Sequence, residues 1–140
     1  MSSEFGFGKV VEESFDGAIQ KVTAELEKEG FGVLSGDDAI TMPLLAAGID
    51  GVISVVANAF PKTFGEMVHF GREGSIEKSR EAHYDLLDVT GMFFAEGNPG
   101  GVKASLAKQG VMKPIMRQPL YPISNGLKAQ IEKETDRLLS

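Results

Sequence analysis

Hydrophobic and polar positions follow two different periods over the first thirty residues of the chain. Residues 5–11 alternate with a period of two, which places Phe5, Phe7 and Lys9 on one face and predicts a β-strand. Residues 14–30 carry apolar side chains at helical spacing, between a serine suited to an N-cap and a glycine suited to a C-cap. The pattern therefore predicts a strand followed by an amphipathic helix.

Two further strands are expected in the next part of the chain. Residues 31–35 form a short, mostly apolar run, and residues 51–57 are apolar on both faces, which is typical of a strand covered by helices in a parallel sheet. Between them, Asp37 or Asp38 is expected to cap a helix that ends at Gly48. Short connections of this kind form right-handed crossovers, so the three predicted strands should lie parallel.

The remainder of the chain is predicted to be helical. Its order of elements makes the fold class α/β: a three-stranded parallel βαβαβ unit followed by a four-helix C-terminal region. As domains, we expect a βαβαβα partial-barrel unit over residues 1–74, which includes the first of these helices, and a helical C-terminal region over residues 75–140. A proline-containing extended connection is expected at residues 111–123. The helices that follow the last predicted strand are expected at residues 61–74, 75–95, 98–110 and 124–140.

Composition restricts the classes of function. The chain has 140 residues, a net charge of −6 and no cysteine, and we find no basic cluster of the kind that follows a phosphate backbone. Nucleic acid is therefore not an expected partner, and neither is a membrane, because no apolar segment is long enough to span one. With no signal peptide recognised, we expect a cytoplasmic protein. His69 and His83 stand on different predicted helices, so no metal site and no cofactor is predicted.

Five short segments carry a resemblance to a known family. They are Leu34-Ser35-Gly36-Asp37-Asp38, Gly51-Val52-Ile53-Ser54-Val55, Ala57-Asn58, Glu96-Gly97-Asn98-Pro99 with Val102-Lys103, and Pro119-Leu120-Tyr121-Pro122-Ile123-Ser124. By these segments, residues 33 to about 125 resemble the C-terminal portion of the dihydrodipicolinate synthase and N-acetylneuraminate lyase family. The resemblance implies the last two strands of a TIM barrel, its last helix and the family's appended helical domain. A whole barrel needs roughly 250 residues, so only a barrel fragment is expected.

The first residues resemble something else. Residues 5–34, with Ser14-Phe15-Asp16 and Glu29-Gly30-Phe31-Gly32-Val33-Leu34, look like the opening βαβ of a small bacterial family of unknown function, domain of unknown function three hundred and two. The chain thus looks like a chimera, in which residues 1–34 come from that family and residues 35–74 supply the last lyase strands. Both an engineered and a natural fusion would produce this pattern.

The lyase resemblance implies a catalytic lysine. The family uses a lysine that forms a Schiff base with pyruvate, and by position Lys9 would be that residue. A lysine near a strand end is otherwise a solvated charge or a block against edge-to-edge pairing, and we favour this second interpretation. The family's paired hydroxyl residues and tyrosines belong to earlier strands that the chain does not contain, and Tyr84 and Tyr121 lie in the predicted helical region.

Four other positions have two interpretations each. Gly36 and Ile53 match family positions that line the pyruvate pocket, but they also suit close packing of strand and helix, which we favour. Asp37 and Asp38 could act as paired carboxylates in acid–base chemistry or metal binding, and capping of the next helix is the favoured role.

These observations lead to one function hypothesis and two alternatives. We expect a folded chain without catalysis of its own, whose role is structural, and which self-associates as a homodimer or larger homo-oligomer because a three-stranded sheet has two open edges. The first alternative is a pyruvate-dependent Schiff-base lyase that uses Lys9 and takes a small keto acid as its partner. The second alternative is a module that binds a small ligand or another protein.

Overall fold

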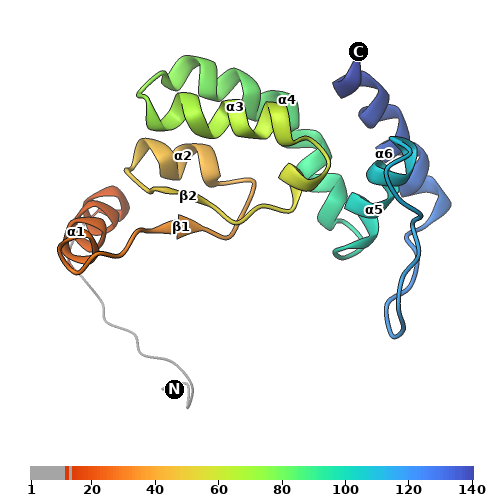
Figure 1. Ribbon diagram of the computed structural model, residues 1–140, viewed down its shortest axis with the longest axis horizontal. Coiled ribbons are helices and arrows are strands. Elements are labelled where there is room, and N and C mark those ends of the chain that lie inside the picture. Colours follow the sequence, from red (N-terminus) through yellow and green to blue (C-terminus); the bar gives the residue numbers. More distant parts are fainter. Residues whose placement is uncertain (1–11, 13) are drawn as a thin grey trace.

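The computed structural model describes residue 12 and residues 14–140. Two parallel strands form a short sheet. Figure 1 shows α2, α3 and α4 on one side of this sheet and α5 and α6 beyond it. Within the described residues the order is one helix, a strand, a helix, a strand, a 3₁₀ turn and four helices. The elements are α1 (Phe15–Lys28), β1 (Leu34–Ser35), α2 (Thr41–Ala46), β2 (Gly51–Val52), η1 (Val56–Asn58), α3 (Pro61–Arg72), α4 (Ile76–Phe94), α5 (Gly100–Lys108) and α6 (Asn125–Leu139).

Helix α1 is bounded by the serine and the glycine that the sequence offers as its N-terminal and C-terminal caps. The Ser14 Oγ accepts a hydrogen bond from the Gly17 N–H at 3.1 Å, which satisfies one free amide of the first turn. Gly30 follows the helix with φ of 79°, a conformation that glycine adopts without a steric penalty. The helix predicted over residues 14–30 is therefore confirmed. Figure 1 shows α1 at one end of the molecule, apart from α3 and α4.

The sheet consists of β1 and β2, which pair in parallel. Leu34 lies opposite Gly51 and Ser35 opposite Val52. The pairing extends by one bond at each end, where the Asp50 N–H donates to the Val33 carbonyl at 2.8 Å and the Ile53 N–H donates to the Ser35 carbonyl at 2.9 Å. Both strands are shorter than predicted. The third strand, predicted at residues 5–11, lies outside the described residues.

The prediction of a strand over residues 51–57 was wrong in its second half, and the reason is Asp38. The carboxylate of this buried residue accepts hydrogen bonds from the Val55 N–H at 2.9 Å and the Val56 N–H at 3.3 Å. These bonds use the amides that a continuing strand would offer to a neighbour, and the chain turns into η1. The Asn58 side chain closes the turn by donating to the Ser54 carbonyl at 3.2 Å.

The expected cap of α2 by Asp37 or Asp38 was also wrong. The helix begins at Thr41, and Ile40 precedes it without a side-chain cap. Asp37 Oδ1 instead accepts from the Ala39 N–H at 2.8 Å, within the loop. Pro43 lies in the first turn of α2, where a missing N–H costs little because the first amides of a helix have no intrahelical partner.

The hydrophobic core lies among η1, α3, α4, α5 and α6. The rings of Phe60 and Phe93 are stacked with centroids 6.3 Å apart. Gly101 on α5 passes so close to α4 that an added Cβ would stand 2.5 Å from the Phe93 Cα. The buried apolar residues of this core are Val56, Ala59, Phe60, Phe64, Met67, Leu86, Val89, Phe93, Val102, Ala104, Leu127 and Ile131.

A chain of buried polar groups ties α5 and α6 to η1. Thr135 Oγ1 donates to the Ile131 carbonyl at 2.7 Å, so the 2.8 Å contact with Ser105 must use the Ser105 hydroxyl as donor. Gln109 Nε2 then donates to Ser105 Oγ at 3.3 Å and to the Ala59 carbonyl at 3.0 Å. Every hydroxyl proton of this network has an acceptor, so the contacts are satisfied despite burial.

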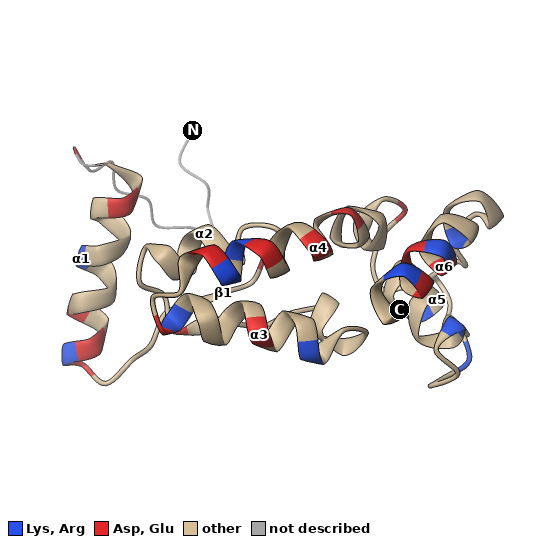
Figure 2. Ribbon diagram, turned by 90° about the horizontal axis from the view of Figure 1, so that it is seen from above, with Lys and Arg blue, Asp and Glu red and all other residues tan. Residues whose placement is uncertain are grey.

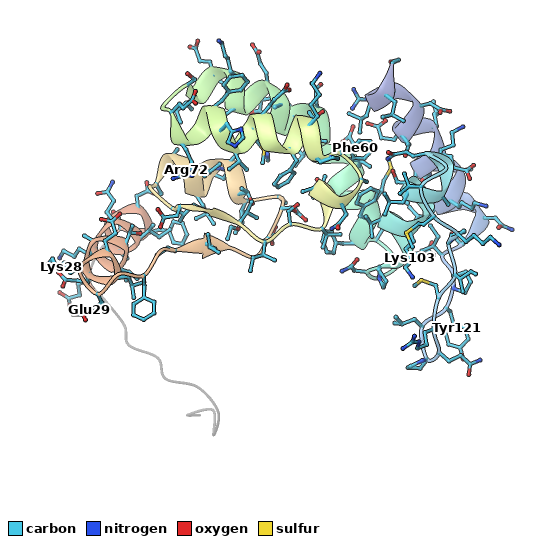
Figure 3. All side chains as sticks on the ribbon, in the orientation of Figure 1. Lys28, Glu29, Phe60, Arg72, Lys103 and Tyr121 are labelled. Carbon is cyan, nitrogen blue, oxygen red and sulfur yellow. The ribbon has the colours of Figure 1, made fainter. Side chains whose placement is uncertain are left out.

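Acidic and basic residues are mixed on the outer surface of the helices. Figure 2 shows acidic and basic segments interspersed along α3, α4 and α6. Figure 3 shows Tyr121 near the tip of the long connection between α5 and α6, where its side chain is exposed. This connection is the extended segment predicted at residues 111–123. No helix among the described residues is long and apolar enough to cross a bilayer.

Candidate functional site at the strand ends

Two of the predicted pocket residues lie next to each other at the carboxyl ends of the strands. Gly36 directly follows β1, and Ile53 directly follows β2. The hydrogen bond from the Ile53 N–H to the Ser35 carbonyl holds the two ends together at 2.9 Å. In parallel α/β folds, ligands bind at this end of the sheet. The structure therefore brings Gly36 and Ile53 to the place where a binding site would form.

At the carboxyl ends of the strands, Gly36 faces another element of the fold and Ile53 does not. Gly36 lines an open cleft of about 360 Å³, whose other wall is α4. Ile53 does not line this cleft, and its side chain is 74% exposed. No side chain of the described residues covers Ile53 as an enclosed pocket would require. The residues that line the cleft are Gly36, Asp37, Ala39, Leu87, Thr90, Gly91 and Phe94.

The loop after β1 is held rigidly by its own hydrogen bonds. Ser35 Oγ accepts from the Asp37 N–H at 3.1 Å, and Thr41 Oγ1 donates to the Asp37 carbonyl at 2.7 Å. Asp38 points into the protein and is 4% exposed, with its carboxylate on the amides of η1. The two aspartates therefore do not form an exposed pair for acid–base chemistry. Within the described residues, no group of three or more histidine and carboxylate side chains could hold a metal ion.

The other candidate residues do not join this site. Lys9 lies outside the described residues. Tyr84 is exposed on α4 beside His83, with ring centroids 5.6 Å apart, and Tyr121 projects from the connection after α5. Partial burial lowers the pKa of His83, because desolvation disfavours the charged imidazolium. His69 is exposed on α3.

The wall of the cleft that α4 supplies was not predicted from the sequence. Leu87, Thr90, Gly91 and Phe94 recur at spacings of three, one and three residues, which places them on one face of a helix. This stripe was available in the sequence. It could not be assigned to the strand ends, because its position depends on how α4 crosses the end of the sheet.

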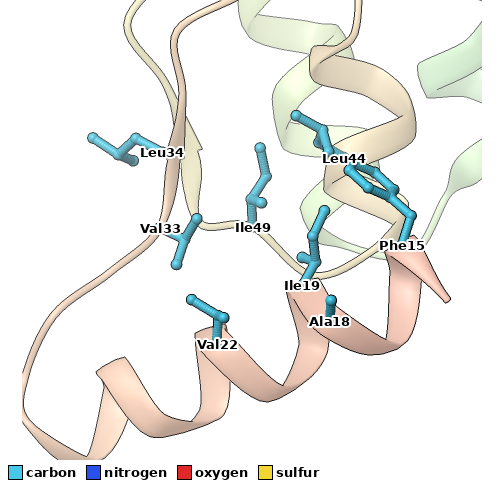
Figure 4. A pocket seen from close by; sticks show the side chains of 8 residues that line it. All are labelled: Phe15, Ala18, Ile19, Val22, Val33, Leu34, Leu44 and Ile49. Atoms are coloured by element: carbon cyan, nitrogen blue, oxygen red, sulfur yellow. The ribbon is translucent and has the colours of Figure 1, made fainter. Parts of the chain in front are cut away.

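A second cavity lies on the other side of β1. Figure 4 shows α1 facing β1 and α2 across an open space, which we call the α1 cleft. It has a volume of about 340 Å³, and all of its lining side chains are apolar. Phe15, Ile19 and Val22 line it from α1, and Val33, Leu44 and Ile49 line it from the opposite side.

Comparison with known proteins identifies the scaffold. The model of the dihydrodipicolinate synthetase family matches residues 11–137. The chain belongs to this family. The match includes α1, whose sequence was expected to come from a second family, and it extends into the last turn of α6.

The relatives share a large part of this chain. The 4-hydroxy-tetrahydrodipicolinate synthase of Trichlorobacter lovleyi is 39% identical over 124 residues, which cover 82% of this chain. The crystal structure of dihydrodipicolinate synthase from Aquifex aeolicus superimposes with a TM-score of 0.79 at 32% identity and covers 92% of the chain. A structure described as the first monomeric dihydrodipicolinate synthase variant has a TM-score of 0.76 at 37% identity and covers 86% of the chain.

The chain covers a much smaller share of the relatives' own length. The chain spans 43% of the Trichlorobacter protein, 43% of the Aquifex chain and 42% of the monomeric variant. It therefore corresponds to a partial barrel with its helical region. Both strands of the described residues, β1 and β2, lie within the range that the family model matches.

Proposed function

We propose that this chain is a folded part of a dihydrodipicolinate synthase scaffold that does not catalyse by itself and whose role is structural. The observation that supports this proposal is the exposure of the strand ends. Gly36 and Ile53 lie side by side there, and the Ile53 side chain is 74% exposed, so no enclosed pocket surrounds it. A Schiff-base lysine must lose its proton near neutral pH, which requires a desolvated pocket. The described residues supply only one wall of such a pocket, and one wall does not remove water from a lysine amine.

Self-association follows from the surfaces that the sheet leaves open. Two parallel strands have two edges, and unpaired strand edges bind other chains. Large apolar side chains are exposed on and beside this sheet, at Phe31, Leu34 and Ile53. We expect a homodimer or larger homo-oligomer, which light scattering at micromolar concentration would detect. A monomer at that concentration would contradict the assembly role.

The second candidate function is a pyruvate-dependent lyase with Lys9 as the imine-forming residue. Membership of the family favours it, as does the position of Gly36 and Ile53 at the carboxyl ends of the strands. In this case a second chain would complete the pocket, and a small keto acid would be the substrate. The cytoplasmic location expected from the sequence suits either function.

Trapping with borohydride separates the two functions. The chain is incubated with pyruvate, reduced with borohydride and analysed by peptide mass spectrometry. We expect no adduct at Lys9 above the level found at exposed lysines such as Lys62. An adduct that is confined to Lys9, lost in Lys9→Gln and retained in the matched control Lys62→Gln, would establish the lyase and overturn the proposal.

Two finer predictions about organisation remain part of this proposal. The first is that residues 1–34 derive from a second family, which makes the chain a chimera. The second is the division into residues 1–74 and 75–140, although α3 and α4 pack against each other across that boundary. The binding-module alternative is supported only by the α1 cleft, which is apolar and open.

A further inference from the structure

The start of α6 contains the only asparagine–glycine pair of the sequence, Asn125-Gly126. Figure 1 shows α6 after the long connection that leaves α5. The Asn125 side chain is exposed, and no described residue forms a hydrogen bond with it. Together with Lys128 and Met116 it lines a cavity of about 250 Å³. The side chain therefore has room to rotate, and water has access to it.

The backbone N–H of Gly126 is not used by the helix. The first N–H groups of a helix have no acceptor within it. Here the Leu127 N–H donates to Ser124 Oγ at 3.2 Å, and the Lys128 N–H donates to the Ser124 carbonyl at 3.0 Å. The Gly126 N–H, which precedes them, has no acceptor among the described residues. Because glycine has no Cβ, the Asn125 side chain can approach this nitrogen without obstruction.

We propose that Asn125 is a deamidation site of the folded chain, at which the side-chain amide becomes a carboxylate without an enzyme. The Gly126 nitrogen gives up its proton to solvent base and attacks the Asn125 Cγ. A bond forms between these two atoms, the bond between Cγ and Nδ2 breaks, and Nδ2 takes up a proton from water and leaves as ammonia. Water then opens the succinimide ring at either carbonyl, which gives an aspartyl or an isoaspartyl link. No oxidant or reductant is needed.

The other two asparagines of the sequence are internal controls. Asn98 precedes Pro99, whose nitrogen carries no proton, so this route is closed. The Asn58 side chain donates to two backbone carbonyls of the preceding turn, at 3.0 and 3.2 Å. The next nitrogen is also in use, since the Ala59 N–H donates to the Val56 carbonyl at 3.0 Å. Both reacting groups are therefore held at Asn58, and neither is held at the start of α6.

Deamidation changes the structure where the long connection enters α6. An isoaspartyl link passes the backbone through the former side chain and lengthens it by a methylene carbon. The hydrogen bonds from Leu127 and Lys128 to Ser124 both span this link, so they lose their geometry. Leu127 is 8% exposed and belongs to the hydrophobic core. A displaced first turn of α6 therefore also disturbs the packing of the core.

The test uses the full chain, kept folded at mildly alkaline pH in heavy-oxygen water, which labels each site where water opens the ring. The protein is then digested at acidic pH, and the labelled peptides are measured by mass spectrometry. Label should enter Asn125 at least about tenfold faster than Asn58, because glycine leaves the attacking nitrogen unobstructed. Asn98 should take up none. A smaller ratio between Asn125 and Asn58 would overturn the proposal.

Two comparisons show whether the fold itself leaves this site open. In Gly126→Ala the added Cβ would lie 3.9 Å from Ser124 Oγ, an ordinary contact, so the helix should form as before. The rate at Asn125 should fall by about tenfold or more, and a smaller decrease would exclude the Gly126 nitrogen as the attacking atom. The second comparison is with the chain unfolded in urea. Label should enter the unfolded chain less than about a hundredfold faster, because only the first turn of α6 must open. Stronger protection in the folded chain would contradict the proposal.

The structural consequence is measured on the separated products. Ion exchange separates the deamidated forms from the unmodified chain, because each carries an additional negative charge. The isoaspartyl form should melt at a lower temperature than the unmodified chain when unfolding is followed by circular dichroism. Equal melting temperatures would show that the start of α6 tolerates the longer backbone and would overturn this second step. None of these measurements depends on catalysis or self-association, so this proposal and the proposed function can fail independently.

Discussion

Two regions of this molecule contain phenylalanines on amphipathic helices, and their environments differ completely. Phe93 on α4 is fully buried and stacked on Phe60, whereas Phe15 on α1 is 69% exposed. Around Phe93, helices α3, α5 and α6 supply packing partners from segments far apart in the chain. Around Phe15, the described residues leave the α1 cleft open. The periodic pattern of a helix thus predicts which face is apolar, and burial depends on whether another element covers that face.

The largest expected effect tests this difference directly. Phe93→Ala should lower the free energy of unfolding by about 3–5 kcal/mol, because it creates a cavity in a closely packed core. Phe15→Ala should change it by no more than about 0.5 kcal/mol, as is usual for an exposed position. Urea denaturation of both variants measures the two values. A large loss in Phe15→Ala would contradict this expectation and show that the apolar face of α1 is covered in solution.

A smaller effect is expected where two helices touch through a glycine. An added Cβ at Gly101 would stand 2.5 Å from the Phe93 Cα and 2.9 Å from its carbonyl oxygen. Gly101→Ala should therefore push α5 away from α4 and cost about 1–3 kcal/mol. Gly91→Ala is the control, since an added Cβ there has no neighbour within 4 Å. In the middle of a helix this change should stabilise the protein by about 0.5–1 kcal/mol. Thermal unfolding distinguishes the opposite signs.

The smallest expected effect is a pH dependence at the start of α6. Glu96 accepts hydrogen bonds from the Ser124 backbone N–H at 2.6 Å and from the Ser124 hydroxyl at 2.5 Å. These bonds lower the pKa of Glu96 below its ordinary value of 4.5, because they favour the charged carboxylate. A depressed pKa stabilises the folded state above the unfolded-state pKa, and the gain disappears as pH falls through the folded-state pKa.

Glu96→Gln should consequently reduce the melting temperature slightly at pH 7. The difference from the unchanged chain should shrink as the pH falls below 4.5, and it should disappear once the pH has also fallen through the lowered folded-state pKa of Glu96. Calorimetry over this range measures the effect, with Glu77→Gln on the exposed surface of α4 as a control. A difference that is independent of pH would show that the Glu96 contacts do not depend on its charge.

Helix positions were predictable because their signals are local. Ser14 and Gly30 bracket α1, and Pro61 stands in the first turn of α3, where its missing N–H costs nothing. The family resemblance of residues 33 to about 125 also came from short segments of sequence, and the family match extends it to residues 11–137. At the candidate site, the sequence placed Gly36 directly after its strand, whereas Ile53 was expected inside the strand over residues 51–57 and instead directly follows β2.

The errors occurred where distant residues decide the local structure. The apolar run over residues 51–57 has the composition of a strand, but the carboxylate of Asp38, seventeen positions before Val55, takes the amides of its second half. The same contact removes Asp38 from the cap predicted for α2. The wall of the cleft at Thr90 and Phe94 depends on how α4 crosses the strand ends, which periodicity does not describe.

By itself, the sequence determined which segments form helices, which faces of them are apolar and to which family the scaffold is related, because caps, glycines and periodic side chains act within a few residues. Only the tertiary structure decided that Asp38 ends the second strand, that Phe93 is enclosed, and that Ile53 stands exposed at the strand ends. Each of these outcomes depends on groups brought together from distant parts of the chain, and the free energy of a contact depends on what surrounds it rather than on the residue alone.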